Sequence, residues 1–448
     1  MDCPLPRFLL PGLLSLTLGA GSLAQSPPEP AAEVLDLSQF KPSESVLLEE
    51  AMGFVRAGNP GRAITLFLDL LRYHPEGVHA EEVLYRVARC YRDLGRFPEA
   101  REALSLWQKK YPQGLWSPAV QLLSGEMLAA EGKWKEALPL FQKSASSENK
   151  EIALRSDYLT VLAAENLREL GRAAPALTRL LAAGKDSPHY HYASLKQGTL
   201  LAEQGKGREA LVFFKQVLGS GATEAAKAEA AVRAGQICHE AGEFRDAIAY
   251  YEVVRKTAAP DFWKKLAHFG LIQSHFSLPD YAATLKVFNE VRPEFPEQVR
   301  SQVFFLSAEA ARLGGQRDEA LSLYEFILKE FPKTSLAEPS LWGRILLLQS
   351  EAGKTRKGRE SLLAETARYL GLFPKGAWVY QVQLIRADLT YEAQDYKAAA
   401  PMLAALIRNE SGFADLAKPV QAALLFRSAH AALLLKDYAA AGRGFDRF

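Results

Sequence analysis

The sequence is poor in cysteine, with three in 448 residues. Cys3 stands before the apolar stretch at the N-terminus, so Cys90 and Cys238 are the two that remain in the body of the chain. In the repeat register described below they lie four repeats apart, far beyond the Cα separation of roughly 7 Å that a disulfide allows. We therefore expect two free, buried thiols and a fold stabilised by packing rather than by cross-links.

The sequence also lacks an excess of charge of either sign. Its 54 lysine and arginine residues against 52 aspartate and glutamate residues give a formal net charge of +2. A nucleic-acid-binding protein gains affinity from a basic field that displaces counterions, and such a field is missing here. The eight histidines form no set with cysteine or carboxylate side chains at the spacing of metal ligands. We expect no nucleic-acid partner, no metal and no cofactor.

Long apolar runs are missing except for Phe8–Leu18, which is too short to span a bilayer comfortably. Small residues and the tripeptide SLA at 22–24 follow it, as they do before a signal-peptidase site. Residues 1–24 are therefore predicted to be a cleaved signal peptide, and no cysteine follows that would make a lipoprotein. Residues 25–42, which contain SPPEP, are typical of a flexible lead-in. We expect an exported, soluble protein without an integral membrane span.

What the chain has in abundance is a repeated pattern. Residues 95–112 (GRFPEAREALSLWQKKYP) and 315–332 (GQRDEALSLYEFILKEFP) share one spacing, although few residues are identical. Small residues flank a turn, and a large apolar residue follows one helical turn later. Apolar residues at helical spacing on both sides of a turn describe two helices packed as a hairpin, and such hairpins must stack to bury both faces. Eleven units recur at intervals of 34 to 42 residues, with the turn residues Gly58, Gly95, Gly132, Gly171, Gly205, Gly242, Pro279, Gly315, Gly353, Gln394 and Lys436.

The small, large and proline positions resemble those of the tetratricopeptide repeat, and the resemblance covers residues 43–448. It implies an all-α fold, a right-handed α-solenoid of about eleven helix pairs with an incomplete last repeat. The helix ends YHPEG, KKYPQG, PEFPEQ, KEFPKT and GLFPKG also resemble periplasmic tetratricopeptide repeat proteins of Gram-negative envelopes. These include the outer-membrane assembly lipoprotein and the Tol–Pal-associated division coordinator. This second resemblance implies a periplasmic scaffold of the cell envelope that binds a protein partner and is not an enzyme.

In tetratricopeptide repeat proteins the first helix of each pair lines a concave groove. The groove positions lie ten residues before the turn, where this chain is apolar and partly aromatic, and six residues before it, where the chain is mostly acidic or amide. Such a stripe suits an extended peptide or an amphipathic helix. The alternative is that the apolar stripe packs between neighbouring first helices and belongs to the core. The candidate groove residues are Tyr85, Arg89, Glu126, Glu165, Phe269, Gln273, Phe305 and Glu309.

Two other interpretations stay open. The tetrapeptide ESGF that begins at Glu410 resembles the start of the lytic transglycosylase motif, although the rest of that motif is missing. This resemblance implies a peptidoglycan-cleaving enzyme with Glu410 as general acid. The chain also stops part-way through the second helix of the eleventh unit, which leaves Phe445 and Phe448 without a following pair. An uncovered end predicts self-association there, or a segment of a larger envelope assembly.

Overall fold

The structure is a computed structural model that describes residues 41–291, 295, 297–353 and 355–448. The predicted signal peptide, residues 1–24, and all but the end of the predicted lead-in lie outside the described residues. The chain divides after Lys110 into two compact units, which are described separately.

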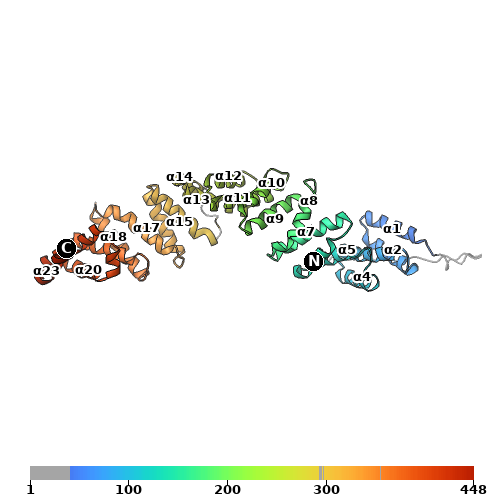
Figure 1. The fold of residues 1–448 in the computed structure, drawn as a ribbon, viewed down its shortest axis with the longest axis horizontal. Helices are drawn as coiled ribbons and strands as arrows, with labels where there is room; N and C mark the ends of the chain where they lie inside the picture. The colour runs from blue at the N-terminus through green and yellow to red at the C-terminus, as the bar shows by residue number, and fades with distance from the viewer. Residues whose placement is uncertain (1–40, 292–294, 296, 354) are drawn as a thin grey trace, which may run out of the picture. The chain divides into compact units, whose positions relative to one another are not determined.

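The first unit, as far as it is described, consists of two helix pairs (Figure 1). The two helices of each pair pack together, and α2 also packs against α3. At the start of α2, Asn59 accepts a hydrogen bond from the backbone N–H of Arg62, and Pro60 takes the first helical position, where no N–H is needed. The helices are α1 (Glu44–Arg56), α2 (Pro60–Tyr73), α3 (Ala80–Asp93) and α4 (Phe97–Lys110).

The second unit repeats this plan in nine further pairs among its described residues. Each second helix packs against its own first helix, and all but the last, α23, also pack against the first helix of the next pair. The first helices are α5 (Ser117–Ala130), α7 (Lys150–Asn166), α9 (Tyr190–Glu203), α11 (Glu224–Glu240), α13 (Asp261–Ser277), α15 (Glu297–Leu313), α17 (Ala337–Ala352), α19 (Val379–Glu392) and α22 (Lys418–Leu434). The second helices are α6 (Trp134–Ser144), α8 (Ala174–Ala182), α10 (Gly207–Leu218), α12 (Phe244–Arg255), α14 (Tyr281–Val291), α16 (Arg317–Glu330), α18 (Arg356–Leu372), α20 (Tyr396–Arg408) and α23 (Tyr438–Arg447). A short helix, α21 (Glu410–Ala414), precedes α22. The predicted all-α array of eleven helix pairs is confirmed.

The turns explain the recurrence of glycine, and they correct one predicted turn. Gly132 and Gly205 have φ angles of 76° and 75°, a left-handed conformation that glycine adopts without strain. In the fourth pair the left-handed residue is Arg168, at φ 58°, and not Gly171 as predicted. Gly171 lies instead in a short 3-10 helix, Leu170–Ala173, that leads into α8. With the turn at Arg168, the intervals to the neighbouring turns become 36 and 37 residues, more regular than predicted.

The small positions let a large side chain of the second helix fill the space between two helices. A Cβ atom on Gly125 of α5 would lie 2.6 Å from the Phe141 ring of α6, and one on Gly198 of α9 would lie 2.7 Å from Phe214 of α10. Both phenylalanines are fully buried. The predicted pairing of small and large positions is therefore confirmed in these units.

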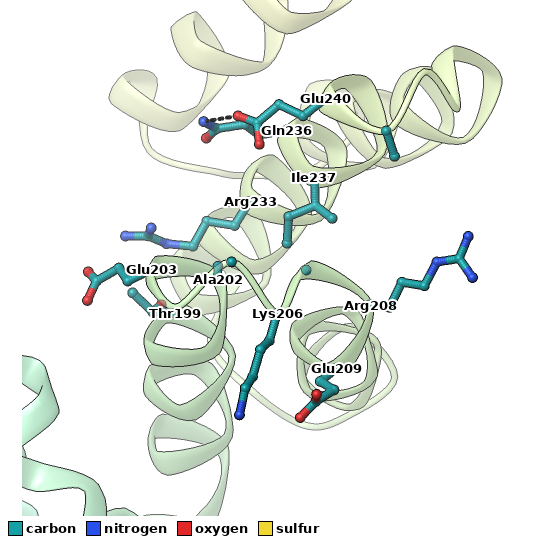
Figure 2. Close-up of a pocket in the computed structure, with 13 residues that line it drawn as sticks. Thr199, Ala202, Glu203, Lys206, Arg208, Glu209, Arg233, Gln236, Ile237 and Glu240 are labelled. Carbon is teal, nitrogen blue, oxygen red and sulfur yellow. Dashed lines mark hydrogen bonds between the residues drawn. The ribbon is translucent and has the colours of Figure 1, made fainter.

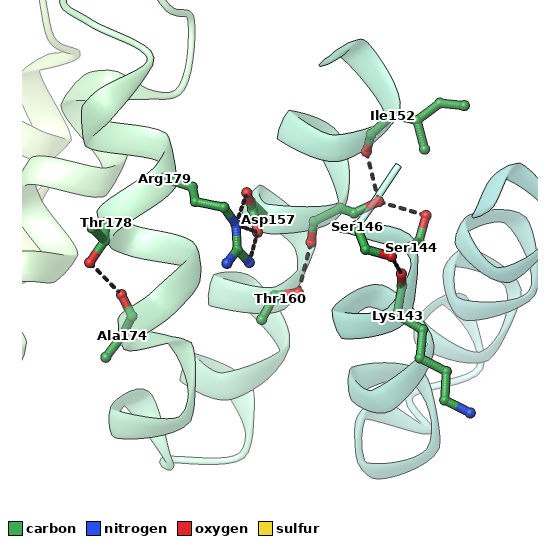
Figure 3. A network of polar contacts seen from close by, with 10 residues as sticks. Lys143, Ser144, Ser146, Ile152, Asp157, Thr160, Ala174, Thr178 and Arg179 are labelled. Carbon is green, nitrogen blue, oxygen red and sulfur yellow. Dashed lines mark hydrogen bonds and ion pairs between the residues drawn. The ribbon is translucent and has the colours of Figure 1, made fainter. Parts of the chain in front are cut away.

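Between α6, α7 and α8 the core holds buried polar side chains beside its apolar ones (Figure 3). Ser144 and Ser156 are fully buried, their hydroxyl oxygens are 2.9 Å apart, and Thr160 Oγ1 donates to the Ser156 carbonyl at 2.8 Å. Asp157, which is 1% exposed, accepts hydrogen bonds from Arg179 Nε at 2.9 Å and from Arg179 Nη2 at 2.6 Å. An ion pair between Asp157 and Arg179 thus joins α7 to α8.

The two cysteines are free and buried, as the sequence predicted. Burial raises the pKa of Cys90 and of Cys238 to about 11. Because the thiolate is the reactive form, neither cysteine is a candidate nucleophile or metal ligand.

Candidate partner-binding face

The candidate site is one face of the first helices. Residues 13, 10, 6 and 3 positions before each turn are spaced three or four apart, so they lie on one side of a helix. We call this the first-helix face. From α5 to α15 its residues are Ala119, Leu122, Glu126 and Ala129; Arg155, Tyr158, Leu162 and Glu165; Tyr192, Leu195, Thr199 and Ala202; Glu229, Val232, Gln236 and His239; Leu266, Phe269, Gln273 and Phe276; Gln302, Phe305, Glu309 and Arg312.

The corrected turn changes which residues of α7 belong to this face. Val161 lies ten residues before the predicted turn residue Gly171 and would belong to this face, but it is fully buried. Counting from the observed turn assigns Tyr158, which is half-buried, stacks on His189 with ring centroids 4.5 Å apart, and lines an open pocket. Glu165 stays on the face, three residues before the turn instead of six. Sequence reasoning missed Tyr158 because glycine is the usual turn residue, and the more regular spacing was the signal that could have found it.

Two predicted acidic residues are held by side chains of the next first helix. Glu126 of α5 accepts a hydrogen bond from Arg155 Nε of α7 at 2.6 Å. Glu165 of α7 accepts hydrogen bonds from Lys196 Nζ at 2.6 Å and from Tyr192 Oη at 2.8 Å, both on α9. These carboxylates are therefore already engaged in contacts between successive helix pairs.

Lys196 continues this set of contacts to α11. Its side chain is 7% exposed, and its Nζ lies 3.5 Å from Glu229 Oε1 of α11 and 5.6 Å from the centre of the Tyr192 ring. Glu229 in turn accepts a hydrogen bond from Arg233 Nε at 3.0 Å. We call the contacts from Glu126 to Arg233 the polar ladder. A buried cation needs such partners, since desolvation without them is costly.

The apolar residues of the first-helix face, ten positions before each turn, differ in exposure from one helix to the next. Leu122, Leu195 and Val232 are 7%, 3% and 8% exposed. For these three residues the alternative interpretation, packing between neighbouring helices, describes the structure. Phe269 and Phe305 are half-buried, and each packs with part of its ring against the hydrophobic core.

The predicted residues Phe269, Gln273, Phe305 and Glu309 lie on two adjacent first helices, α13 and α15. On α13 the face consists of Leu266, Phe269, Gln273 and Phe276, all partly exposed and none charged. Together with Phe305 of α15 we call these residues the apolar stretch.

Glu309 borders the apolar stretch, and its charge is balanced on its own helix. Its carboxylate accepts a hydrogen bond from Arg312 Nη2 at 2.6 Å and another from the hydroxyl of Tyr324. Tyr324 comes from the second helix α16 and is fully buried, with its ring 6.4 Å from that of Phe305. Phe305 and Glu309 are therefore both fixed by one tyrosine that sequence reasoning did not connect with them.

Tyr85 and Arg89 belong to α3 in the first unit and are described by themselves. Tyr85 is half-buried and Arg89 is exposed. Their place in a binding groove stays a prediction.

A cleft that sequence reasoning missed opens between α9, α10 and α11 (Figure 2). Its volume is about 690 Å³. Ala202 and Ile237 form an apolar floor, with Glu203 and Glu240 at its rim. Both carboxylates stand two residues before a turn, outside the two positions considered from the sequence. Their identical place in consecutive pairs was the signal that could have found them.

Glu410, the residue considered as a general acid, is the first residue of the short helix α21. It is exposed, and residues 418–434 that follow form α22, a first helix of the array. The motif that would complete a transglycosylase site is replaced by a repeat helix.

Aromatic side chains of the last pair are exposed. Phe426, Phe445 and Phe448 are 43%, 37% and 63% exposed. The ring of Phe426 lies 6.0 Å from that of Phe445 and 5.7 Å from that of Phe448.

Two kinds of feature are missing from the described part of the chain. There, three or more histidine, cysteine or acidic side chains nowhere gather as they would around a metal ion. None of the helices described is both long and apolar enough to cross a membrane.

Models of one repeat family match parts of the sequence. Two family models, both described as tetratricopeptide repeat, match the chain, one over residues 48–114, 158–225 and 195–262 and the other over residues 302–334. A tetratricopeptide repeat protein from Parabacteroides merdae aligns with a TM-score of 0.36 at 16% identity, covering 61% of this chain and 98% of that one. Yeast Tom70 aligns with a TM-score of 0.31 at 12% identity, covering 89% and 98%.

PilF of Pseudomonas aeruginosa aligns with a TM-score of 0.29 at 10% identity, covering 66% of this chain and 95% of that one. Scores at this level carry no argument about function. No curated protein matches the sequence. The helix pairs and the family models together show that this chain contains tetratricopeptide repeats.

Proposed function

We propose that this protein is a non-catalytic scaffold that binds a protein partner, as a peptide or a helix, along the first-helix face of α13 and α15. The observation that carries this proposal is the apolar stretch, in which aromatic rings at helical spacing are packed on one side and open on the other. Rings that are already fixed lose little conformational freedom when a partner covers them. The amide of Gln273, between Phe269 and Phe276, is suited to hydrogen bonds with a partner's backbone.

We also propose that the partner belongs to the cell envelope and that the protein is exported to the periplasm. The support for this location is the apolar run and SLA tripeptide before Gln25, together with the aromatic–proline helix ends. The test of the binding face therefore starts from an envelope extract.

Replacing Phe269 and Phe305 together with alanine is expected to abolish retention of the partner. Truncating two aromatic anchors that a partner covers costs about 2 kcal/mol or more each at a binding hot spot, enough to lose a complex during washing. The measurement is a pull-down with the full chain as bait, followed by quantification of each retained protein.

The matched control replaces Val212 and Val253, two exposed side chains on the second helices α10 and α12, with alanine. Circular dichroism of all baits checks that helix content is preserved. A partner retained equally by the Phe269→Ala, Phe305→Ala bait would place the interface elsewhere and refute the proposed face.

We further propose that the exposed aromatic side chains of α22 and α23 mediate self-association. Apolar surface of this kind is removed from water by a second copy. Sedimentation velocity of the full chain is expected to show a concentration-dependent dimer that Phe445→Glu, Phe448→Glu reduces to a monomer. A wild-type chain that sediments as a monomer at every concentration would rule this out.

A further inference from the structure

The charges around the Figure 2 cleft are unequally compensated. Arg233 donates from Nε to Glu229 and belongs to the polar ladder. Glu240 accepts a hydrogen bond from the neutral amide of Gln236 at 2.9 Å. Within the described residues, neither Glu203 nor Glu240 forms an ion pair, and both are exposed. Two carboxylates thus stand at the rim without a cation of their own.

The remaining charged residues of the cleft come from α10 and the turn before it. They are Lys206, Arg208 and Glu209. In Figure 2 the side chains of all three extend away from Ile237 at the floor. Arg233 also lines the cleft, but its charge is engaged by Glu229. The uncompensated charges left around the apolar floor are therefore those of Glu203 and Glu240, and Glu203 extends outward from Ile237.

We propose that this cleft receives lysine or arginine side chains of the bound partner, which is therefore a basic amphipathic helix. A long basic side chain fits because its aliphatic stem can lie on Ala202 and Ile237 while its charged end reaches Glu203 or Glu240. The uncharged apolar stretch on α13 begins one pair further along, so one helix can place apolar residues there and basic residues at the cleft. This inference rests on the proposed function and adds the chemistry of the partner.

The test uses two synthetic 18-residue helices with the same leucine face, one with lysine and one with glutamate on the polar face. Binding to the full chain is measured by fluorescence anisotropy at low and high salt. The lysine helix is expected to bind at least tenfold more tightly than the glutamate helix, with an affinity that falls as salt screens the charges. Glu203→Gln with Glu240→Gln is expected to weaken the lysine helix about fivefold, as two partly exposed ion pairs predict.

The control, Glu136→Gln with Glu148→Gln, removes the same charge from exposed positions on α6 and the loop after it. It should leave binding unchanged. If the control weakens binding as much as the cleft variant, or if both helices bind equally, the inference is wrong. A third outcome separates the two proposals. If the Phe269→Ala, Phe305→Ala variant binds neither synthetic helix while the Glu203→Gln, Glu240→Gln variant binds both as the wild type does, the basic partner is refuted and the proposed function stands. If the wild-type chain binds neither helix, both proposals fail.

Discussion

Replacing Arg179 with alanine is expected to lower the local stability of α7 and α8 by about 2 kcal/mol at neutral pH. This is less than the cost of breaking a fully buried pair, because the Arg179 side chain is itself 51% exposed. Asp157 would remain 1% exposed without the guanidinium that now donates to both of its oxygens. Native-state hydrogen exchange of residues 150–182 measures this directly, because it reports the free energy of local opening.

The loss should depend on pH in a defined direction. Burial raises the pKa of Asp157 above its ordinary value of 3.8, and Arg179 opposes that rise. A carboxyl group whose pKa is raised by folding favours the folded state when protonated, so its contribution is largest below about pH 4 and is lost as the pH rises through the folded-state pKa. Removing Arg179 raises that pKa further. The stability difference between the variant and the wild type should therefore shrink as the pH falls.

The matched comparison is Arg179→Ala combined with Asp157→Asn. Asparagine removes the stranded charge at nearly constant volume, so the double variant should be more stable than Arg179→Ala alone at neutral pH. A single variant that loses the same stability at every pH, with no recovery in the double variant, would show that Asp157 carries no stranded charge there.

Replacing Gly270 with valine is expected to cost about 3 kcal/mol, the upper end of the overpacking range. Gly270 of α13 faces the ring of Tyr251 from α12, which also lies against Gly235 of α11. A Cβ on Gly235 would come within 2.7 Å of that ring, and Tyr251 is only 4% exposed. The ring is enclosed between two helices and cannot yield to a branched side chain.

Urea unfolding followed by circular dichroism, fitted with a nearest-neighbour repeat model, measures this effect. Gly371→Val is the control, because Gly371 lies in α18 with open space around it. Combining Gly270→Val with Tyr251→Ala should cost clearly less than the sum of the two single variants. If the free-energy costs of the two single variants simply add, the valine side chain does not contact Tyr251.

The helix pairs could be predicted from the sequence because their causes are local. The apolar spacing, the small residue before the turn and the glycine at the turn each act within one pair. The left-handed turns at Gly132 and Gly205 follow from glycine alone. In the fourth pair the prediction failed, because Arg168 and not the nearby Gly171 adopts the left-handed conformation. The predicted turn residues Gln394 and Lys436 do adopt it, although neither is glycine.

The proposed binding face could be predicted only in outline. Periodicity placed Phe269 and Phe305 at matching positions, and the structure brings their helices together. The periodicity of the sequence could not show that Glu126 and Glu165 already have partners on the next first helix. Those contacts join residues about 30 positions apart, and no local pattern records which side chain will reach across.

The amino-acid pattern was sufficient to predict paired helices and, except on α7, the apolar side of the first helices. Both follow from the helical spacing of apolar residues, which is visible within a single repeat of about 37 residues. The tertiary structure alone decided which of these faces is covered and which charges are compensated. Leu195 is buried and Phe269 is half-exposed although both occupy the same position in the repeat. The reason is that coverage depends on the size and reach of side chains from neighbouring helix pairs, which differ from one repeat to the next.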